Sequence, residues 1–298
     1  MNILCIDIGG TFIKYAHMNE NCEFLLKGRI ETPSSGRDAL IASITSLFRS
    51  FPGCEGIAIS MAGIIDSDNG YCRMGGAIRY NDNFFIRDAL FKECPVPIVI
   101  DNDAKCAAMA EAAIGSLKDV NDGVLITIGT MVGGGIIHDK KLIRGKHFSA
   151  GEVSYLIPNT EKAATPDNVW GNFCGTPRLC KLYAEKCGID TTSETITGFD
   201  VFEALSDGVI EAEEALNEYT RHIAVQLFNI QNFFDPELIS ISGGISERPE
   251  LIYYIRKNLE KLYDECPYQI PHVQVVSSTF KNDANLIGAL QVYLEKYR

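Results

Sequence analysis

An apolar strand that runs into a glycine turn and then into a second strand occurs twice in this chain, and this repeat constrains the fold most strongly. Residues 3–8 (ILCIDI) break at Gly9-Gly10 and continue into a strand pattern at 11–18. Residues 124–129 (VLITIG) lead through a small-residue turn into a second strand, GGIIHD. A supersecondary unit that recurs in both halves predicts two related domains. The length of 298 residues also favours two cores over one.

Strand, turn and helix patterns alternate along the rest of the chain. We expect helices over about 36–50, 84–93, 103–115, 177–187, 200–206, 209–234, 249–263 and 283–296, and strands over about 23–30, 55–60, 97–101, 238–242 and 272–277. Residues 156–175 show no regular pattern, and the polar stretch 116–122 (SLKDVND) is the expected linker. This alternation favours an α/β architecture.

Charge and cysteine usage restrict the class of partner and the cellular compartment. The formal net charge is -12 and the sequence pI is about 4.9, which argues against nucleic acid or an anionic membrane as partner. No apolar run approaches the roughly 20 residues that span a bilayer, and the N-terminus lacks a signal-peptide pattern. The ten cysteines are scattered, and several, such as Cys5 and Cys106, stand in apolar segments. We therefore expect buried reduced thiols in a cytoplasmic protein.

The first candidate site is the turn Asp7-Ile8-Gly9-Gly10-Thr11, with Lys14 beyond it. An apolar strand here delivers a carboxylate to glycines, whose backbone can approach an anionic ligand closely, and Thr11 adds a hydroxyl donor. An ordinary hairpin turn is the alternative interpretation. A second glycine-rich turn spans residues 128–135 (IGTMVGGG), where close approach of a phosphate chain would explain so many glycines after a strand.

Two further motifs follow strands. Gly243 and Gly244 come after the strand LISIS and lead to a helix, so they fit either a ligand site or a plain strand-to-helix turn. Asn102 and Asp103 stand where a strand ends and a helix begins, the position at which ligands gather in open α/β sheets. Helix capping needs only one of these polar residues. A carboxylate at this position can accept a proton from a hydroxyl during phosphoryl transfer.

Taken in order, DIGGT (7–11), DNDA (101–104), IGTMVGGG (128–135), AGE (150–152) and SGG (242–244) resemble the ROK family of sugar kinases. The resemblance covers essentially the whole chain, and within the family the chain is most similar to the β-glucoside kinases. It implies an actin-like (ribonuclease H-like) two-domain α/β fold with a central ligand cleft. The domains would comprise residues 1–117, joined by the C-terminal helix at about 283–298, and residues 118–282.

The resemblance also implies roles for the motif residues. Asp103 would be the catalytic base, and the sugar would be bound by Asn83, Asn102, Asp103, Glu152 and Tyr155. ATP and its phosphates would be held by Asp7, Gly9, Gly10, Thr11, Lys14, Gly129, Thr130, Gly133, Gly134, Gly243 and Gly244. Asp7 would also lie near the Mg²⁺ ion that accompanies the phosphates. Relatives of this kind are often dimers, so a homodimer is expected.

The sequence departs from the family pattern at three places. Met131 replaces the second glycine of the usual Gly-Thr-Gly phosphate loop. Tyr155 replaces the histidine of Gly-Glu-x-Gly-His, and Asn172 stands where the first cysteine of the family's zinc motif is expected. A tetrahedral zinc site needs four well-placed nitrogen or sulfur ligands. We therefore expect no structural zinc.

These observations predict an ATP-dependent kinase that phosphorylates the 6-hydroxyl of a hexose unit, with a β-glucoside such as cellobiose as the expected acceptor. Without a metal on that side of the sugar, Tyr155 or Trp170 would be free to stack on a second ring. If Tyr155 only fills core space, a glucose or N-acetylmannosamine kinase is the alternative. A weakly catalytic sugar sensor is a further alternative. Regulators of this family carry an N-terminal helix-turn-helix, whereas this chain enters its first strand by Ile3.

Overall fold

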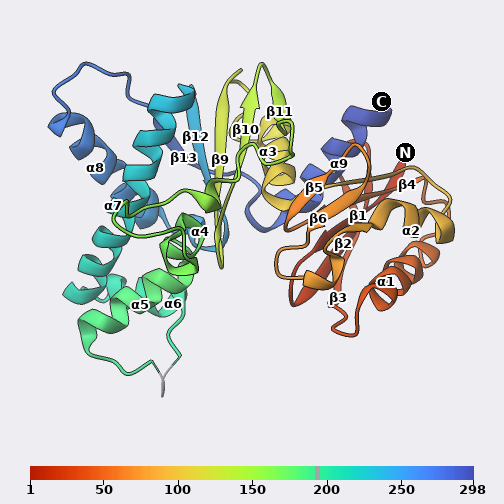
Figure 1. Cartoon of the computed structure of the whole chain (residues 1–298), viewed down its shortest axis with the longest axis horizontal. Helices are drawn as coiled ribbons and strands as arrows, with labels where there is room; N and C mark the ends of the chain where they lie inside the picture. The colour runs from red at the N-terminus through yellow and green to blue at the C-terminus, as the bar shows by residue number, and fades with distance from the viewer. Residues whose placement is uncertain (192–194) are drawn as a thin grey trace.

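A computed structural model describes residues 1–191 and 195–298 of the chain. Its first half is built on a five-stranded sheet with strand order β3-β2-β1-β4-β8. The strands are β1 (Asn2–Ile8), β2 (Phe12–Asn19), β3 (Phe24–Glu31), β4 (Gly56–Met61) and β8 (Ile98–Asn102). Helices α1 (Arg37–Arg49) and α2 (Ile86–Glu93) belong to the same half, on the right of Figure 1.

The second half repeats this topology in a five-stranded sheet with order β11-β10-β9-β12-β13. Its strands are β9 (Gly123–Ile128), β10 (Val132–His138), β11 (Lys141–Ile143), β12 (Leu238–Ser242) and β13 (Gln274–Ser277), and its longer helices are α5 (Thr176–Cys187), α6 (Gly198–Ser206), α7 (Ile210–Phe234) and α8 (Pro249–Glu265). In each sheet an antiparallel hairpin, β1–β2 or β9–β10, is followed by a parallel neighbour of its first strand, β4 or β12. The predicted internal repeat is confirmed.

Two helices lie between the sheets. Helix α3 (Asp103–Ile114) follows β8 and packs against β9 and β10, and it also packs along α9 (Ala284–Tyr297). Helix α9 in turn covers β1, β4 and β8, so the end of the chain returns to the first half (Figure 1). The α3 face that meets α9 and β10 is rich in alanine, which lets the backbones approach. The exact domain boundary at residues 117 and 118 remains a prediction.

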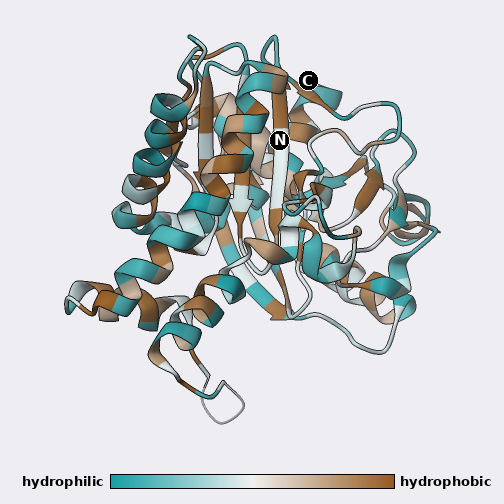
Figure 2. Cartoon of the chain, turned by 60° about the vertical axis from the view of Figure 1, so that its left-hand side comes forward, coloured by the Kyte–Doolittle hydropathy of each residue, from teal (hydrophilic) through white to brown (hydrophobic). Residues whose placement is uncertain are grey.

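The central strands are apolar because both of their faces are covered. Ile3, Leu4, Cys5 and Ile6 of β1 are fully buried, and every residue of β4 is buried. Such continuous apolar runs are typical of parallel sheets with helices on both faces. Figure 2 shows brown, hydrophobic segments along strands in the middle of the molecule and many teal, hydrophilic residues on the surrounding helices. Cys5 and Cys106 are buried free thiols, as expected.

A third, three-stranded sheet was not expected from the sequence. It consists of β5 (Ile64–Asp66), β6 (Tyr71–Met74) and β7 (Phe84–Phe85). The segment thought to be irregular holds short helical turns, among them α4 (Trp170–Phe173). No helix in the described ranges 1–191 and 195–298 is long and apolar enough to cross a membrane.

Candidate active site

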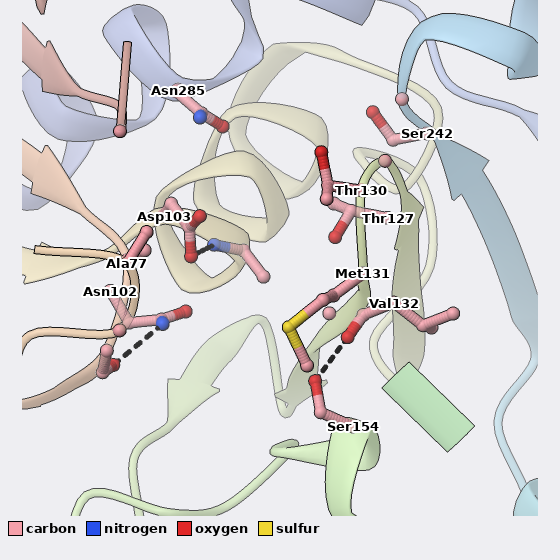
Figure 3. A pocket seen from close by; sticks show the side chains of 18 of the residues that line it. Ala77, Asn102, Asp103, Thr127, Thr130, Met131, Val132, Ser154, Ser242 and Asn285 are labelled. Atoms are coloured by element: carbon pink, nitrogen blue, oxygen red, sulfur yellow. Dashed lines mark hydrogen bonds between the residues drawn. The ribbon is translucent and has the colours of Figure 1, made fainter. Parts of the chain in front are cut away.

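A cavity of about 740 Å³ lies between the two halves of the chain. It is walled by the β1–β2 turn, the β8–α3 junction, the β9–β10 turn, the loop that carries Glu152, the end of β12 and the start of α9 (Figure 3). Most motifs that the sequence singled out therefore meet at one place. Strand ends and helix starts deliver them there, as expected for an α/β fold.

Asp103 is the first residue of α3 and faces the cavity (Figure 3). Its Oδ1 accepts a hydrogen bond from the backbone N–H of Ala104 at 2.9 Å. Burial raises the pKa of Asp103 to about 6, and repulsion from Asp7 adds to this rise. The carboxylate thus has an oxygen free of any bond found in the described residues and an enhanced tendency to take up a proton.

Asn102 caps helix α3. Its Oδ1 accepts from the backbone N–H of Lys105 at 3.0 Å, and its Nδ2 donates to the carbonyl oxygen of Gly63 at 2.9 Å. The capping interpretation is therefore correct for Asn102, although the residue also lines the cavity. One hydrogen of its side-chain amide is left for a ligand.

The β1–β2 turn brings Gly10, Thr11 and Lys14 to the cavity wall, with Asp7 beneath them. Asp7 Oδ1 accepts from the Ser60 hydroxyl at 3.1 Å and from Asn285 Nδ2 at 3.0 Å, whereas its Oδ2 lies 4.0 Å from Lys14 Nζ. Burial raises the pKa of Asp7, opposed by these bonds and by Lys14. Gly9 does not line the cavity, and its N–H closes the turn onto Phe12 O at 3.0 Å.

In the β9–β10 turn, Gly129, Thr130 and Gly133 line the cavity, and Met131 is 45% exposed beside them (Figure 3). The neighbouring Gly134 and Gly135 allow β10 to pack closely against other segments. A Cβ at Gly135 would lie 2.5 Å from Ala108 Cβ of α3, and one at Gly134 would lie 2.7 Å from Gly151 O. Close packing of β10 against its neighbours therefore explains some of these glycines. From the sequence, close approach of a phosphate chain had been the expected explanation.

Gly243 closes the cavity on the side of β12. Its φ of 103° and the 2.1 Å that would separate an added Cβ from Ile128 O permit only glycine here. Gly244 begins the next short helix and does not line the cavity.

Glu152 and Tyr155 also line the cavity. Glu152 pairs with Lys105 at 2.7 Å. Tyr155 is 51% exposed, and its hydroxyl lies 3.9 Å from Met74 Sδ of β6. The unexpected three-stranded sheet therefore supplies a cavity-lining residue, Met74, that Tyr155 contacts.

Two expectations about ring-binding residues do not hold. Asn83 lies outside the cavity, exposed at φ 55°, where its Oδ1 accepts from the Tyr71 hydroxyl at 3.1 Å. Trp170 has no exposed surface and belongs to the core of the second half, so the idea that it stacks on a second sugar ring is wrong.

Several cavity residues received no role from the sequence, although Ser242 stands in the SGG motif. They are Thr127, Ser154, Ser242, Lys281, Asn282 and Asn285, together with Lys105 behind the wall. Asn285 stands in the closing segment NDANLIGA that resembles the family, which was a usable signal. Lys105 directly follows DNDA, but its partner is 47 residues away, so the sequence alone gave no reason to select it.

The cysteines near residue 174 do not assemble a metal site in the parts of the chain that are described, where no cluster of three His, Cys, Asp or Glu side chains could hold an ion. Cys174 is buried, and its pKa is raised to about 12 by that burial. The absence of a structural zinc nevertheless remains a prediction.

The comparison with known proteins decides the family, because the ROK family model matches residues 3–296. The chain belongs to the ROK family. It is 33% identical to a β-glucoside kinase of Listeria monocytogenes, over 99% of this chain and 98% of that protein. It is also 33% identical to a β-glucoside kinase of Klebsiella pneumoniae, over 100% of this chain and 98% of that protein.

Solved structures agree with this assignment. A ROK family protein from Streptococcus pneumoniae in complex with sucrose matches with a TM-score of 0.89 at 29% identity, over 99% of both chains. A ROK family glucokinase from Streptomyces griseus, in complex with glucose and AMPPNP, matches the fold with a TM-score of 0.85 at 23% identity, over 98% and 99%. This ROK protein is thus a carbohydrate kinase with the two-domain actin-like fold.

Proposed function

We propose that this kinase transfers the γ-phosphoryl group of ATP to the 6-hydroxyl of the non-reducing glucose of a β-glucoside such as cellobiose. The observation that carries the transfer step is the position of Asp103, a cavity-facing carboxylate whose pKa is raised to about 6 and which shares the cavity with two glycine turns. Positioning and charge stabilisation account for most of the catalysis of phosphoryl transfer.

In this proposal Asp103 accepts the proton of the sugar hydroxyl as that oxygen bonds to the γ-phosphorus. The bond between the γ-phosphorus and its bridging oxygen breaks, and ADP leaves with the electron pair. Asn102 and Glu152 orient the sugar, whereas backbone N–H groups of the turns at Gly10 and Gly129 bind the phosphates. Closure of the two halves, which we assign to residues 1–117 with α9 and to residues 118–282, would exclude water.

A Mg²⁺ ion fits beside Asp7. This carboxylate is buried beneath Gly10, Thr11 and Lys14 of the cavity wall, and its Oδ2 has no hydrogen bond within the described residues, only Lys14 at 4.0 Å. Mg²⁺ in such kinases is bound through one or two carboxylates together with substrate phosphates, so a larger cluster of acidic side chains is not required. When bound, the ion neutralises charge on the phosphates, and Asp7 with Thr11 would hold it on their side of the cavity.

The β-glucoside acceptor is supported by Tyr155 and by the named relatives. Tyr155 is half exposed at the cavity wall, so its ring is available to stack on a second sugar. Trp170 is buried and Cys174 is a buried free thiol. We therefore propose that no metal ion takes part in forming this wall. A kinase for glucose or N-acetylmannosamine is the alternative if Tyr155 does not contact the acceptor.

Steady-state kinetics with cellobiose, glucose and N-acetylmannosamine test the acceptor, since discrimination is a ratio of kcat/KM values. We expect the highest kcat/KM for cellobiose, and NMR of the product should locate the phosphate on the 6-oxygen. Tyr155→Ala should lower kcat/KM for cellobiose more than for glucose. A higher value for either monosaccharide in the unmodified enzyme would contradict the β-glucoside assignment and leave the kinase assignment intact.

A further inference from the structure

We propose that Lys105 is a positioning residue of the sugar site, which holds the Glu152 carboxylate in a fixed orientation toward the cavity. Lys105 is the third residue of α3 and follows Asp103 by two positions in the chain. This inference rests on the proposed role of Glu152 in sugar binding. It adds a residue that does not itself touch the cavity.

The contacts of Lys105 are unusual for a lysine. Its side chain is 1% exposed, although lysine is among the residues most rarely buried. The ammonium donates to Glu152 Oε1 at 2.7 Å and to the carbonyl oxygen of Phe148 at 3.2 Å. A buried charge persists only when it is paired and hydrogen-bonded, and both conditions are met here.

The surrounding backbone is shaped to allow this contact. A Cβ at Gly135 would lie 3.5 Å from the Cα of Lys105, so the glycine lets α3 lie against β10 at this point. Phe148 adopts a left-handed φ of 59°, and Gly151 has a φ of 77°. These turns direct the Phe148 carbonyl and the Glu152 side chain toward the same ammonium group. One lysine therefore fixes the loop at two points four residues apart.

The pairing leaves one face of Glu152 available. Its side chain is 15% exposed, and within residues 1–191 and 195–298 its Oε2 has no hydrogen bond. With Oε1 held by Lys105, Oε2 is free to accept from a sugar hydroxyl. The ammonium also offsets negative charge where Glu152, Asp103 and Asp7 lie close together, which would otherwise push these carboxylates apart.

A double-mutant cycle tests the inference. Lys105→Met removes the charge while keeping length, Glu152→Gln removes the partner charge, and the third variant combines both. With saturating MgATP, Lys105→Met should raise the KM for cellobiose and glucose by about 10- to 100-fold, as expected for a displaced binding group. The KM for ATP should change far less. In the Glu152→Gln background the same substitution should change the sugar KM by less than about twofold.

Other variants control for simple loss of structure. Lys105→Arg keeps the cation and should recover part of the sugar KM. Lys186→Met breaks an ion pair with Glu218 between α5 and α7, 3.0 Å long and far from the cavity, and should leave the sugar KM unchanged. If Lys105→Met does not fold, the double variant is compared with Glu152→Gln alone.

The results separate this inference from the proposed function. An unchanged sugar KM in Lys105→Met, or an equal increase in both Glu152 backgrounds, would overturn the positioning role while the wild-type enzyme still phosphorylates its sugar. Absence of sugar phosphorylation by the wild-type enzyme would instead overturn the proposed function and, with it, this inference.

Discussion

A general base must be ionised at the working pH, whereas the surroundings of Asp103 favour its protonated form. Burial and the neighbouring Asp7 raise its pKa to about 6. A carboxylate with such a pKa remains mostly ionised at neutral pH and is a stronger proton acceptor than an ordinary aspartate. General bases work best when their pKa lies near the operating pH.

Asp103→Asn should abolish most phosphoryl transfer and leave the protein folded. Asparagine has the same shape and keeps an oxygen for the Ala104 N–H, but it cannot accept the proton, and loss of a general base costs about 10²–10⁴-fold in rate. Because burial disfavours the charged form of Asp103, a neutral replacement should not lower the melting temperature. Near-wild-type kcat in this variant would show that Asp103 is not the base.

The pH dependence of kcat/KM should reveal the same group. Below its pKa of about 6 Asp103 is protonated and cannot accept the hydroxyl proton, so activity should fall as the pH falls through this region. Initial rates between about pH 5 and pH 9, with Mg²⁺ saturating, provide the measurement. A profile that stays flat down to pH 5 would argue against this assignment.

At the scale of helices and strands, the close packing of α3 on β10 depends on glycines. Gly135→Ala should lower the free energy of unfolding by about 1–3 kcal/mol, because the new Cβ would lie 2.5 Å from Ala108 Cβ and 3.1 Å from Ala104 O. Denaturant unfolding measures the change. Adding Ala108→Gly removes the nearest of these atoms and should restore part of the loss. If Gly135→Ala is as stable as the wild type, the contact with Ala108 does not require a glycine at position 135.

The sequence predicted the central strands β1, β4, β8, β9 and β12 because they are largely buried and read as unbroken apolar runs. The short edge strand β11 was not predicted. The three-stranded sheet was missed because β5, β6 and β7 are two to four residues long and partly polar. The role of Gly135 could not be inferred either, since α3 and β10 are far apart in the sequence. A glycine run gives no indication of whether a helix or a phosphate approaches it.

At the scale of the whole molecule, both connections between the halves meet one buried carboxylate. Glu111 of α3 has no exposed surface. Its Oε2 accepts from the backbone N–H of Ser116 at 2.6 Å, and its Oε1 accepts from those of Thr279 and Phe280 at 2.8 and 2.9 Å. Residue 116 leads into β9, and residues 279–280 lead back toward α9. The carboxylate thus binds both segments that connect the two halves to helix α3.

Glu111→Gln should destabilise the protein by about 1–3 kcal/mol, because a side-chain amide offers one acceptor oxygen where the carboxylate offers two. Thermal unfolding at neutral pH is the measurement, and Glu203→Gln on the exposed surface of α6 serves as the control that should not change stability. Equal melting temperatures for both variants and the wild type would show that Glu111 does not stabilise this junction.

The sequence motifs indicated which segments form the cavity. They did not indicate the junction at Glu111, whose partners are more than 160 residues apart.

The complete burial of Trp170 has an experimental consequence. It is the single tryptophan of the chain, and its backbone N–H donates to Leu156 O at 2.7 Å. Its neighbour Gly171 lies against the methyl end of Met131. The protein therefore carries one tryptophan fluorophore, which is buried behind the β9–β10 turn. Because Met131 lines the cavity and also lies against Gly171, we expect ligand binding that moves Met131 to change the tryptophan emission of the unlabelled enzyme.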